Sequence, residues 1–181
     1  MKKILLSVAL CAVLFSACQK KETPTVEPAP TTSTNSTTTT STTTSPTTTG
    51  TLQTDMLNLV NNLRQKGCNC GSKTMPSVPT LKWNTLLETA ATNHAKDMAT
   101  KNYFSHTGLD GSTIATRADR VGYKWSALGE NIANGYPNTE GVFQGWLASA
   151  GHCENMMSGN FTEMAAARSG NYWVQEFGKG R

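Results

Sequence analysis

The chain has 181 residues, with 16 Lys and Arg against 12 Asp and Glu and a formal net charge of +4. Lys2 and Lys3 lie in a segment that we expect to be removed, which leaves 14 basic and 12 acidic side chains. This small excess gives no argument for a nucleic-acid partner, and the sequence contains no phosphate-binding loop or dinucleotide fingerprint.

The N-terminus has the pattern of a secretory signal. Met1-Lys2-Lys3 is positively charged, and the apolar run from Ile4 to Phe15 is shorter than the roughly 20 residues of a membrane span. Phe15-Ser16-Ala17-Cys18 resembles a bacterial lipobox, whose cysteine is acylated and becomes the new N-terminus. We therefore predict a lipoprotein signal at residues 1–18 and lipidation at Cys18, with the alternative of an ordinary signal peptide and a chance cysteine. The acyl chains would hold the protein on a bacterial membrane, in the cell envelope outside the cytoplasm.

Residues 19–51 are rich in Thr, Ser and Pro and almost free of apolar side chains. Such a segment cannot offset the entropy lost on ordering, so we predict a disordered tether. Residues 52–181 are long enough for one domain with a core and too short for two of usual size.

Within residues 52–181, apolar residues recur with a helical period at 55–65, 84–101, 113–121 and 139–149. Asn84 is a plausible N-cap of the second helix. Residues 162–168 and 172–177 are rich in strand-forming residues and flank the turn Ser169-Gly170-Asn171, which predicts a terminal β-hairpin. Helices followed by late strands predict an α+β domain with helices packed on a small antiparallel sheet.

Several short motifs resemble those of one family. They occur in the order Phe104-Ser105-His106, Gly129-Glu130-Asn131-Ile132-Ala133, Ser149-Ala150-Gly151-His152 and Tyr172-Trp173-Val174-Gln175-Glu176-Phe177-Gly178. Together they are similar to the bacterial branch of the superfamily of cysteine-rich secretory proteins, antigen 5 and pathogenesis-related-1 proteins, also called the CAP or SCP domain. The resemblance implies an α-β-α sandwich over residues 52–181 and an extracellular setting.

Members of this family commonly carry a cleft of two His and two Glu that can hold a divalent metal. His106 and Glu130 match the first His and the first Glu, whereas Ser149 stands where animal and plant members have the second Glu. The later Gly-His motif of those members is also missing, so His152 is our candidate for the second imidazole. This pattern requires no cofactor. Imidazole and carboxylate ligands do suit zinc or another divalent metal. We expect any zinc site here to be weak.

Each of these residues also has a structural alternative. His106 would then hydrogen-bond a loop backbone, Glu130 would cap a turn or pair with a buried amide, and His152 would brace the loop after the fourth helix. His94 lies near the apolar stripe of its helix, where we expect a boundary residue and no ligand.

Cys68, Cys70 and Cys153 are the cysteines of the domain, an odd number in a chain exported to a compartment that tolerates disulfides. Cys68 and Cys70 are too close in sequence to pair without strain, so we predict a disulfide from one of them to Cys153. The alternative is a thiolate metal site formed by all three, with His152 as a further ligand.

No activity follows from these motifs, because no Ser has a nucleophile-elbow context. The function that we expect is a membrane-anchored surface module that binds a lipid, another envelope component or a divalent metal in the His and Glu cleft. The alternative is a metal-assisted hydrolase acting on peptide or cell-wall material.

Overall fold

The computed structural model describes residues 51–181. The predicted lipoprotein signal, Cys18 and nearly all of the predicted tether lie outside the described residues. Among the helices of residues 51–181, none combines the length and the apolar character needed to cross a membrane.

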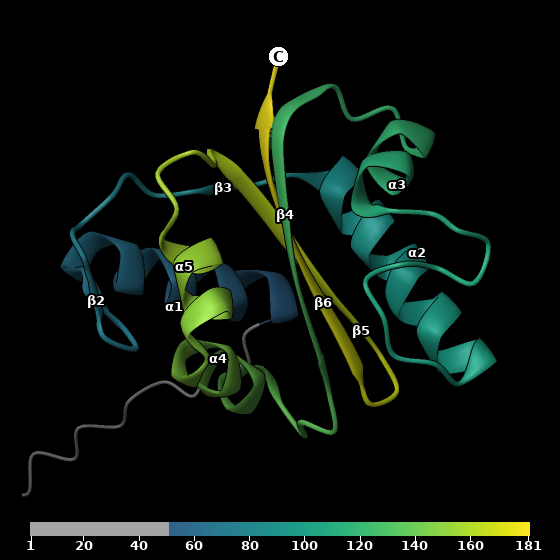
Figure 1. Ribbon diagram of the computed structural model, residues 1–181, viewed down its shortest axis with the longest axis horizontal. Helices are drawn as coiled ribbons and strands as arrows, with labels where there is room; N and C mark the ends of the chain where they lie inside the picture. Colours follow the sequence, from purple (N-terminus) through teal and green to yellow (C-terminus); the bar gives the residue numbers. More distant parts are fainter. Residues whose placement is uncertain (1–50) are drawn as a thin grey trace, which may run out of the picture. The chain divides into compact units, whose positions relative to one another are not determined.

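The described residues form five helices and six strands (Figure 1). The helices are α1 (Leu52–Lys66), α2 (Thr85–Lys101), α3 (Ile114–Arg120), α4 (Thr139–Ala148) and α5 (Ala150–Met157). The strands are β1 (Cys68–Cys70), β2 (Lys73–Met75), β3 (Lys82–Trp83), β4 (Trp125–Asn134), β5 (Glu163–Ser169) and β6 (Tyr172–Gly180).

A four-stranded sheet in the order β3-β5-β6-β4 forms the centre of the domain. The long strands β4, β5 and β6 are antiparallel, as predicted, whereas the two-residue strand β3 pairs in parallel with β5. The predicted antiparallel sheet is therefore correct for the three long strands, and β3 makes the sheet mixed. β1 and β2 form a separate two-stranded hairpin.

Helices cover both faces of this sheet, which gives the predicted α-β-α sandwich (Figure 1). Because side chains alternate along a strand, β6 directs Trp173 and Phe177 into a core with α1, α4 and α5. Val174, on the opposite face of β6, packs on Ala91, Ala95 and Met98 of α2. The two cores are therefore separated by a sheet that is buried on both faces.

The helix boundaries follow local signals that the sequence contains. Asn84 caps α2 by accepting hydrogen bonds from the backbone N–H groups of Leu86 and Leu87, as predicted. Thr113 caps α3 in a capping box with Thr116. The fourth predicted helix ends one residue earlier than expected, at Ala148, because Ser149 is extended with φ −98° and ψ 119°.

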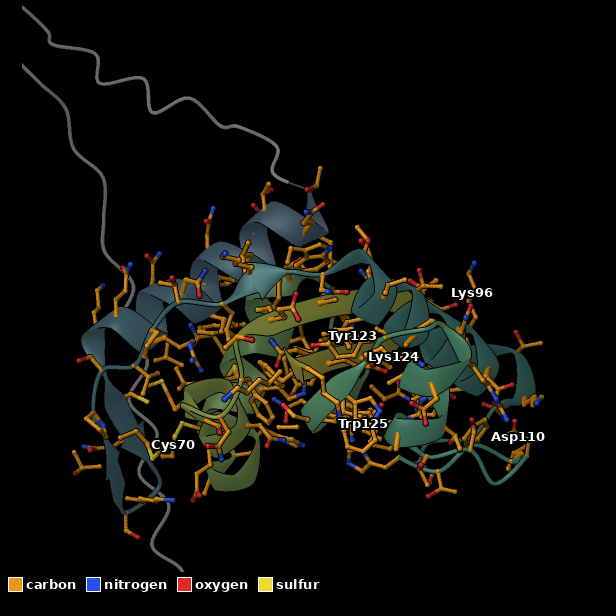
Figure 2. The ribbon with its side chains drawn as sticks, turned by 90° about the horizontal axis from the view of Figure 1, so that it is seen from above. Cys70, Lys96, Asp110, Tyr123, Lys124 and Trp125 are labelled. Atoms are coloured by element: carbon orange, nitrogen blue, oxygen red, sulfur yellow. A yellow bond between two sulfur atoms is a disulfide. The ribbon has the colours of Figure 1, made fainter. Side chains whose placement is uncertain are left out.

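The sequence did not predict β3, β4, α5 or the β1–β2 hairpin. The hairpin follows Gly67 at the end of α1 and packs against α5. His152 and Cys153 consequently lie in α5 and not in the loop that the sequence predicted. Cys70 of the hairpin lies at the opposite end of the domain from Asp110, which follows α2 (Figure 2).

Candidate functional site

His106 lies in the loop that joins α2 to α3, and two buried side chains fix this loop. The ring of His94, only 1% exposed, donates a hydrogen bond from Nε2 to the carbonyl oxygen of Ser105 at 3.0 Å. Arg117 of α3 donates from Nη1 to the carbonyl oxygen of His106 itself at 3.2 Å. His94 is thus buried and not the boundary residue that the sequence suggested, and burial lowers its pKa, which favours the neutral ring.

Glu130 of β4 connects His106 to Arg117. Nδ1 of His106 lies 2.7 Å from one carboxylate oxygen of Glu130, and Nη2 of Arg117 lies 2.6 Å from the other. The side chains of Arg117 and Glu130 are almost fully buried, whereas that of His106 is 57% exposed. The hydrogen bond to Glu130 raises the pKa of His106 above its usual value, although burial opposes this effect.

This arrangement fixes the orientation of the His106 ring. A carboxylate oxygen can only accept, so in the neutral ring Nδ1 carries the hydrogen and donates it to Glu130, and Nε2 therefore carries the free electron pair. Histidines that ligate metals typically donate their other ring N–H to a carboxylate in the same way. The expected pairing of His106 and Glu130 is therefore present, and it leaves Nε2 of this exposed ring as the nitrogen that does not contact Glu130.

His152 lies in α5, and its backbone contacts β4, an edge strand of the sheet. Glu130 faces α3, and the next residue, Asn131, points the opposite way and donates from Nδ2 to the carbonyl oxygen of His152 at 3.1 Å. Burial, reinforced by the charge of His106, lowers the pKa of His152. Within residues 51–181, the potential ligand atoms of His106, Glu130 and His152 do not all lie within 4.8 Å of one another.

The motif Gly129-Glu130-Asn131 has a physical reason at each position. A Cβ at position 129 would lie 2.6 Å from the ring of Phe161, so only glycine allows this close approach. Glu130 is the ion-pair partner of Arg117. Asn131 is fully buried and also donates to the side chain of Gln175 at 2.9 Å.

Two further buried charged residues adjoin this site, and the sequence interpretation missed both. Arg117 lies on the apolar stripe of its helix, beside the buried Ala118. Glu176 of β6 is the register partner of Glu130 and is fully buried. Burial, together with the charge of Glu130, raises the pKa of Glu176 to about 8. The sequence did contain a signal for each residue. Arg117 stands on an apolar helix stripe, and Glu176 stands between the strand residues Val174 and Phe177.

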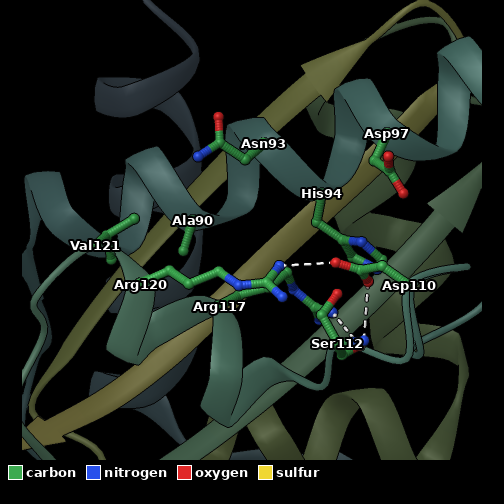
Figure 3. A pocket seen from close by; sticks show the side chains of 9 residues that line it. All are labelled: Ala90, Asn93, His94, Asp97, Asp110, Ser112, Arg117, Arg120 and Val121. Atoms are coloured by element: carbon green, nitrogen blue, oxygen red, sulfur yellow. Dashed lines mark hydrogen bonds and ion pairs between the residues drawn. The ribbon is translucent and has the colours of Figure 1, made fainter.

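A small hollow of about 170 Å³ lies beside the site, between α2 and α3 (Figure 3). His94 and Arg117 form part of its wall, whereas His106, Glu130 and His152 do not line it. The predicted cleft, centred on His106 and Glu130 with His152 as third member, is not this hollow and stays a prediction.

The predicted long-range disulfide is present and joins Cys70 to Cys153, with the two Cα atoms 5.4 Å apart. It connects β1 to α5 across 83 positions of the sequence. Cys68 is the unpaired cysteine of the described domain. The sequence did not decide whether Cys68 or Cys70 pairs with Cys153.

Comparison with known proteins identifies relatives in bacteria. The uncharacterized membrane protein YlbC of Bacillus subtilis is 27% identical over 127 residues, which cover 70% of this chain and 34% of YlbC. The uncharacterized protein YkwD of the same species is 33% identical over 93 residues, covering 50% of this chain and 36% of YkwD. The chain thus spans about a third of the length of these curated relatives.

Solved structures share the fold. An extracellular protein containing an SCP domain from Bacillus anthracis aligns with a TM-score of 0.64 and 28% identity, over 71% of this chain and 40% of that one. An outer surface protein of Borrelia burgdorferi aligns with a TM-score of 0.61 over 71% of this chain and 92% of its own, and at 21% identity it supports the fold alone. A model of the cysteine-rich secretory protein family matches residues 57–177, more than half of the chain. The protein therefore belongs to the cysteine-rich secretory protein family.

Proposed function

We propose that this protein is an envelope-anchored binding module that holds its ligand at His106. The observation that carries the proposal is the chain of contacts from Arg117 through Glu130 to His106. A buried ion pair fixes an exposed imidazole, and the nitrogen Nε2 is left to contact a ligand.

The residues around His106 support two kinds of contact. A neutral imidazole is a good ligand for zinc and similar divalent cations. We propose His152, whose pKa is lowered by burial, as the second imidazole. Phe104 is 51% exposed and Leu109 is 66% exposed, and both lie in the same loop as His106. Exposed apolar side chains beside a polar centre suit the apolar part of a lipid or another envelope component.

The location that we propose is the outside of a bacterial membrane. The relative from Bacillus anthracis is described as extracellular and YlbC as a membrane protein. The lipobox pattern that ends at Cys18 supports attachment through acyl chains, and two or more chains anchor a protein stably.

Zinc titration tests the binding site. By calorimetry on the full chain without reductant, we expect one weak site whose affinity falls at least roughly 10-fold in His106→Ala and less in His152→Ala. The hydrogen bond to Glu130 raises the pKa of His106. Protons therefore begin to displace zinc from this histidine at a higher pH than they would from an ordinary histidine. Affinity should decrease as the pH falls through that pKa, and Glu130→Gln should move this decrease to lower pH.

Glu140→Gln is the matched control, because Glu140 lies in the first turn of α4, away from His106, and its carboxylate accepts a hydrogen bond from Gln144. It should leave zinc affinity unchanged. Absence of zinc binding by the wild type would reject the cation as ligand. Equal affinity in wild type and His106→Ala would place the site elsewhere.

The anchoring is tested by Cys18→Ala. We expect the wild type to incorporate a labelled fatty acid and to require detergent for extraction, because its N-terminal cysteine carries the acyl chains. The variant should lose the label and accumulate as an uncleaved or soluble form. Fatty-acid labelling of Cys18→Ala at the wild-type level would contradict lipidation at this residue.

One observation also favours the hydrolase alternative. With Nδ1–H donated to Glu130, Nε2 of neutral His106 is a proton acceptor, which is the arrangement of a general base. Turnover of peptide or peptidoglycan substrates that is lost in His106→Ala would favour the hydrolase. Zinc binding without turnover would favour the binding module.

A further inference from the structure

We propose that Cys68, Cys70 and Cys153 form a redox-controlled site for a thiophilic divalent cation such as Zn²⁺. When the Cys70–Cys153 disulfide is closed, the site is blocked. When the disulfide is reduced, three thiolates become available to one metal ion. This site is separate from His106 and independent of the proposed function.

The backbone places the three sulfur atoms together. Cys68 and Cys70 are two residues apart in β1, so their side chains leave the strand on the same face, and Asn69 between them is exposed. β1 and β2 both contact α5, which carries Cys153. The sulfur of Cys68 lies 3.7 Å from that of Cys153 and 3.9 Å from that of Cys70.

These two distances fit tetrahedral metal coordination. With zinc–sulfur bonds of about 2.3 Å and tetrahedral angles, two thiolates on one zinc ion are roughly 3.8 Å apart. The two distances from Cys68 already have this value, although Cys68 takes no part in the disulfide. Only Cys70 and Cys153 would have to move apart after their bond is broken.

The surroundings suit a soft metal ion. Cys70 and Cys153 are buried with Met157 in a small apolar cluster, against which Met75 and Leu63 pack. Cys68 is half-buried and leaves one side of the cluster open to solvent. A cation can enter from that side, and water can supply the fourth ligand. Thiolate ligands favour zinc and other soft ions over magnesium or calcium.

The opening step is a two-electron reduction. An external dithiol donates two electrons and two protons, its own thiols become a disulfide, and the Cys70–Cys153 bond is replaced by two thiols. Metal binding then releases protons from the three thiols as thiolates coordinate the ion. The metal would hold the β1–β2 hairpin against α5 in place of the lost disulfide.

The test is a titration with Cd²⁺ of the full chain in which Cys11 and Cys18 are replaced by serine, so that Cys68, Cys70 and Cys153 are its only cysteines. Thiolate ligation of Cd²⁺ is read from its ultraviolet charge-transfer band. The chain is reduced with a phosphine, the phosphine is removed, and the metal is added without oxygen. We expect one equivalent of Cd²⁺ to produce the band in the reduced protein. In the oxidised protein, Cd²⁺ should produce no band. In reduced Cys68→Ser, affinity should fall by roughly 100-fold or more, because one of three ligands is lost.

Asn69→Ser is the matched control and should leave the band unchanged, because Asn69 is exposed between the two cysteines of β1 and supplies no thiolate. Far-ultraviolet circular dichroism, recorded on each reduced sample with and without Cd²⁺, reports whether the fold is kept or is restored by the metal. The proposal is overturned if reduced wild type and reduced Cys68→Ser bind with equal affinity, or if the oxidised protein gives the same band. It is also overturned if the reduced protein gives no band, whether or not it remains folded.

Discussion

Replacing Arg64 by methionine is expected to lower the free energy of unfolding by about 3 kcal/mol. Arg64 is fully buried near the end of α1, and its guanidinium donates to three carbonyl oxygens within 2.9 Å, those of Pro79, Met156 and Ser158. One side chain therefore connects α1 to the segment before β3 and to the end of α5.

Two effects oppose each other at this residue. Burial without a carboxylate partner disfavours the charged guanidinium and lowers the pKa of Arg64 to about 10. Methionine would remove that cost, but it would leave three carbonyl oxygens without donors, at about 1–3 kcal/mol for each one that stays buried. Because three hydrogen bonds to a charged donor are lost, we expect the second effect to be larger.

Urea denaturation with the disulfide intact measures this effect. Arg120→Met is the matched control, because Arg120 is exposed and its ion pair with Asp110 lies on the surface. The control should cost less than about 1 kcal/mol. Equal unfolding midpoints and slopes for the two variants would show that the carbonyl contacts of Arg64 contribute no net stability.

Arg64 also illustrates where sequence interpretation fails in this protein. The apolar stripe of α1 was predicted, and Met56 and Val60 on it are buried. Arg64 continues the same stripe by one further turn, yet an arginine in the last turn of a helix is usually solvated and favourable there. Its carbonyl partners come from segments up to 94 positions away, which no local pattern reveals.

β4 was missed for a related reason. Its sequence, Trp125–Asn134, contains Gly129, Glu130 and Asn131 and shows no alternation of polar and apolar residues. The strand forms because it pairs along its length with β6 and because partners in α3, α5 and β6 satisfy its buried polar groups. By contrast, α2 and the terminal hairpin have strong local signals, and both were predicted.

The candidate site was accessible from the sequence only through the family motifs. Those motifs predicted that His106 and Glu130 belong together, and the two side chains are in contact. Spacing alone could not show this, because 24 positions separate them and only the fold brings them together. Arg117 and Glu176 match none of the site positions carried over from the family. The role of Arg117 depends on the contact of α3 with Glu130, and that of Glu176 depends on the pairing of β6 with β4.

Glu176 is the residue whose charge should matter most for stability. Its carboxylate is fully buried, and neither oxygen has a hydrogen-bond partner within residues 51–181. Burial is the main cause of its raised pKa, the charge of Glu130 adds to it, and the charge of Arg117 opposes it. The folded protein thus holds this side chain as a neutral acid at a pH where an exposed glutamate is ionised.

Glu176→Gln is expected to stabilise the protein, and increasingly so as the pH rises. Below the usual glutamate pKa of 4.5 the residue is protonated in both folded and unfolded chains, so it adds no pH dependence. Between 4.5 and about 8 the unfolded chain loses the proton while the folded protein retains it, so wild-type stability falls by up to about 1.4 kcal/mol per pH unit. At pH 7 the variant should be more stable by on the order of 3 kcal/mol.

The measurement is urea denaturation of both proteins from about pH 4.5 to about pH 8.5, a range that spans the two pKa values. Glutamine has nearly the same shape as the protonated acid and cannot ionise, so the two stability curves should meet at the acidic end and separate towards the alkaline end. Glu140→Gln on α4 is the matched control and should follow the wild type throughout. Wild-type and Glu176→Gln curves that stay parallel over this range would mean that Glu176 is already ionised in the folded protein, with a cation or solvent reaching it.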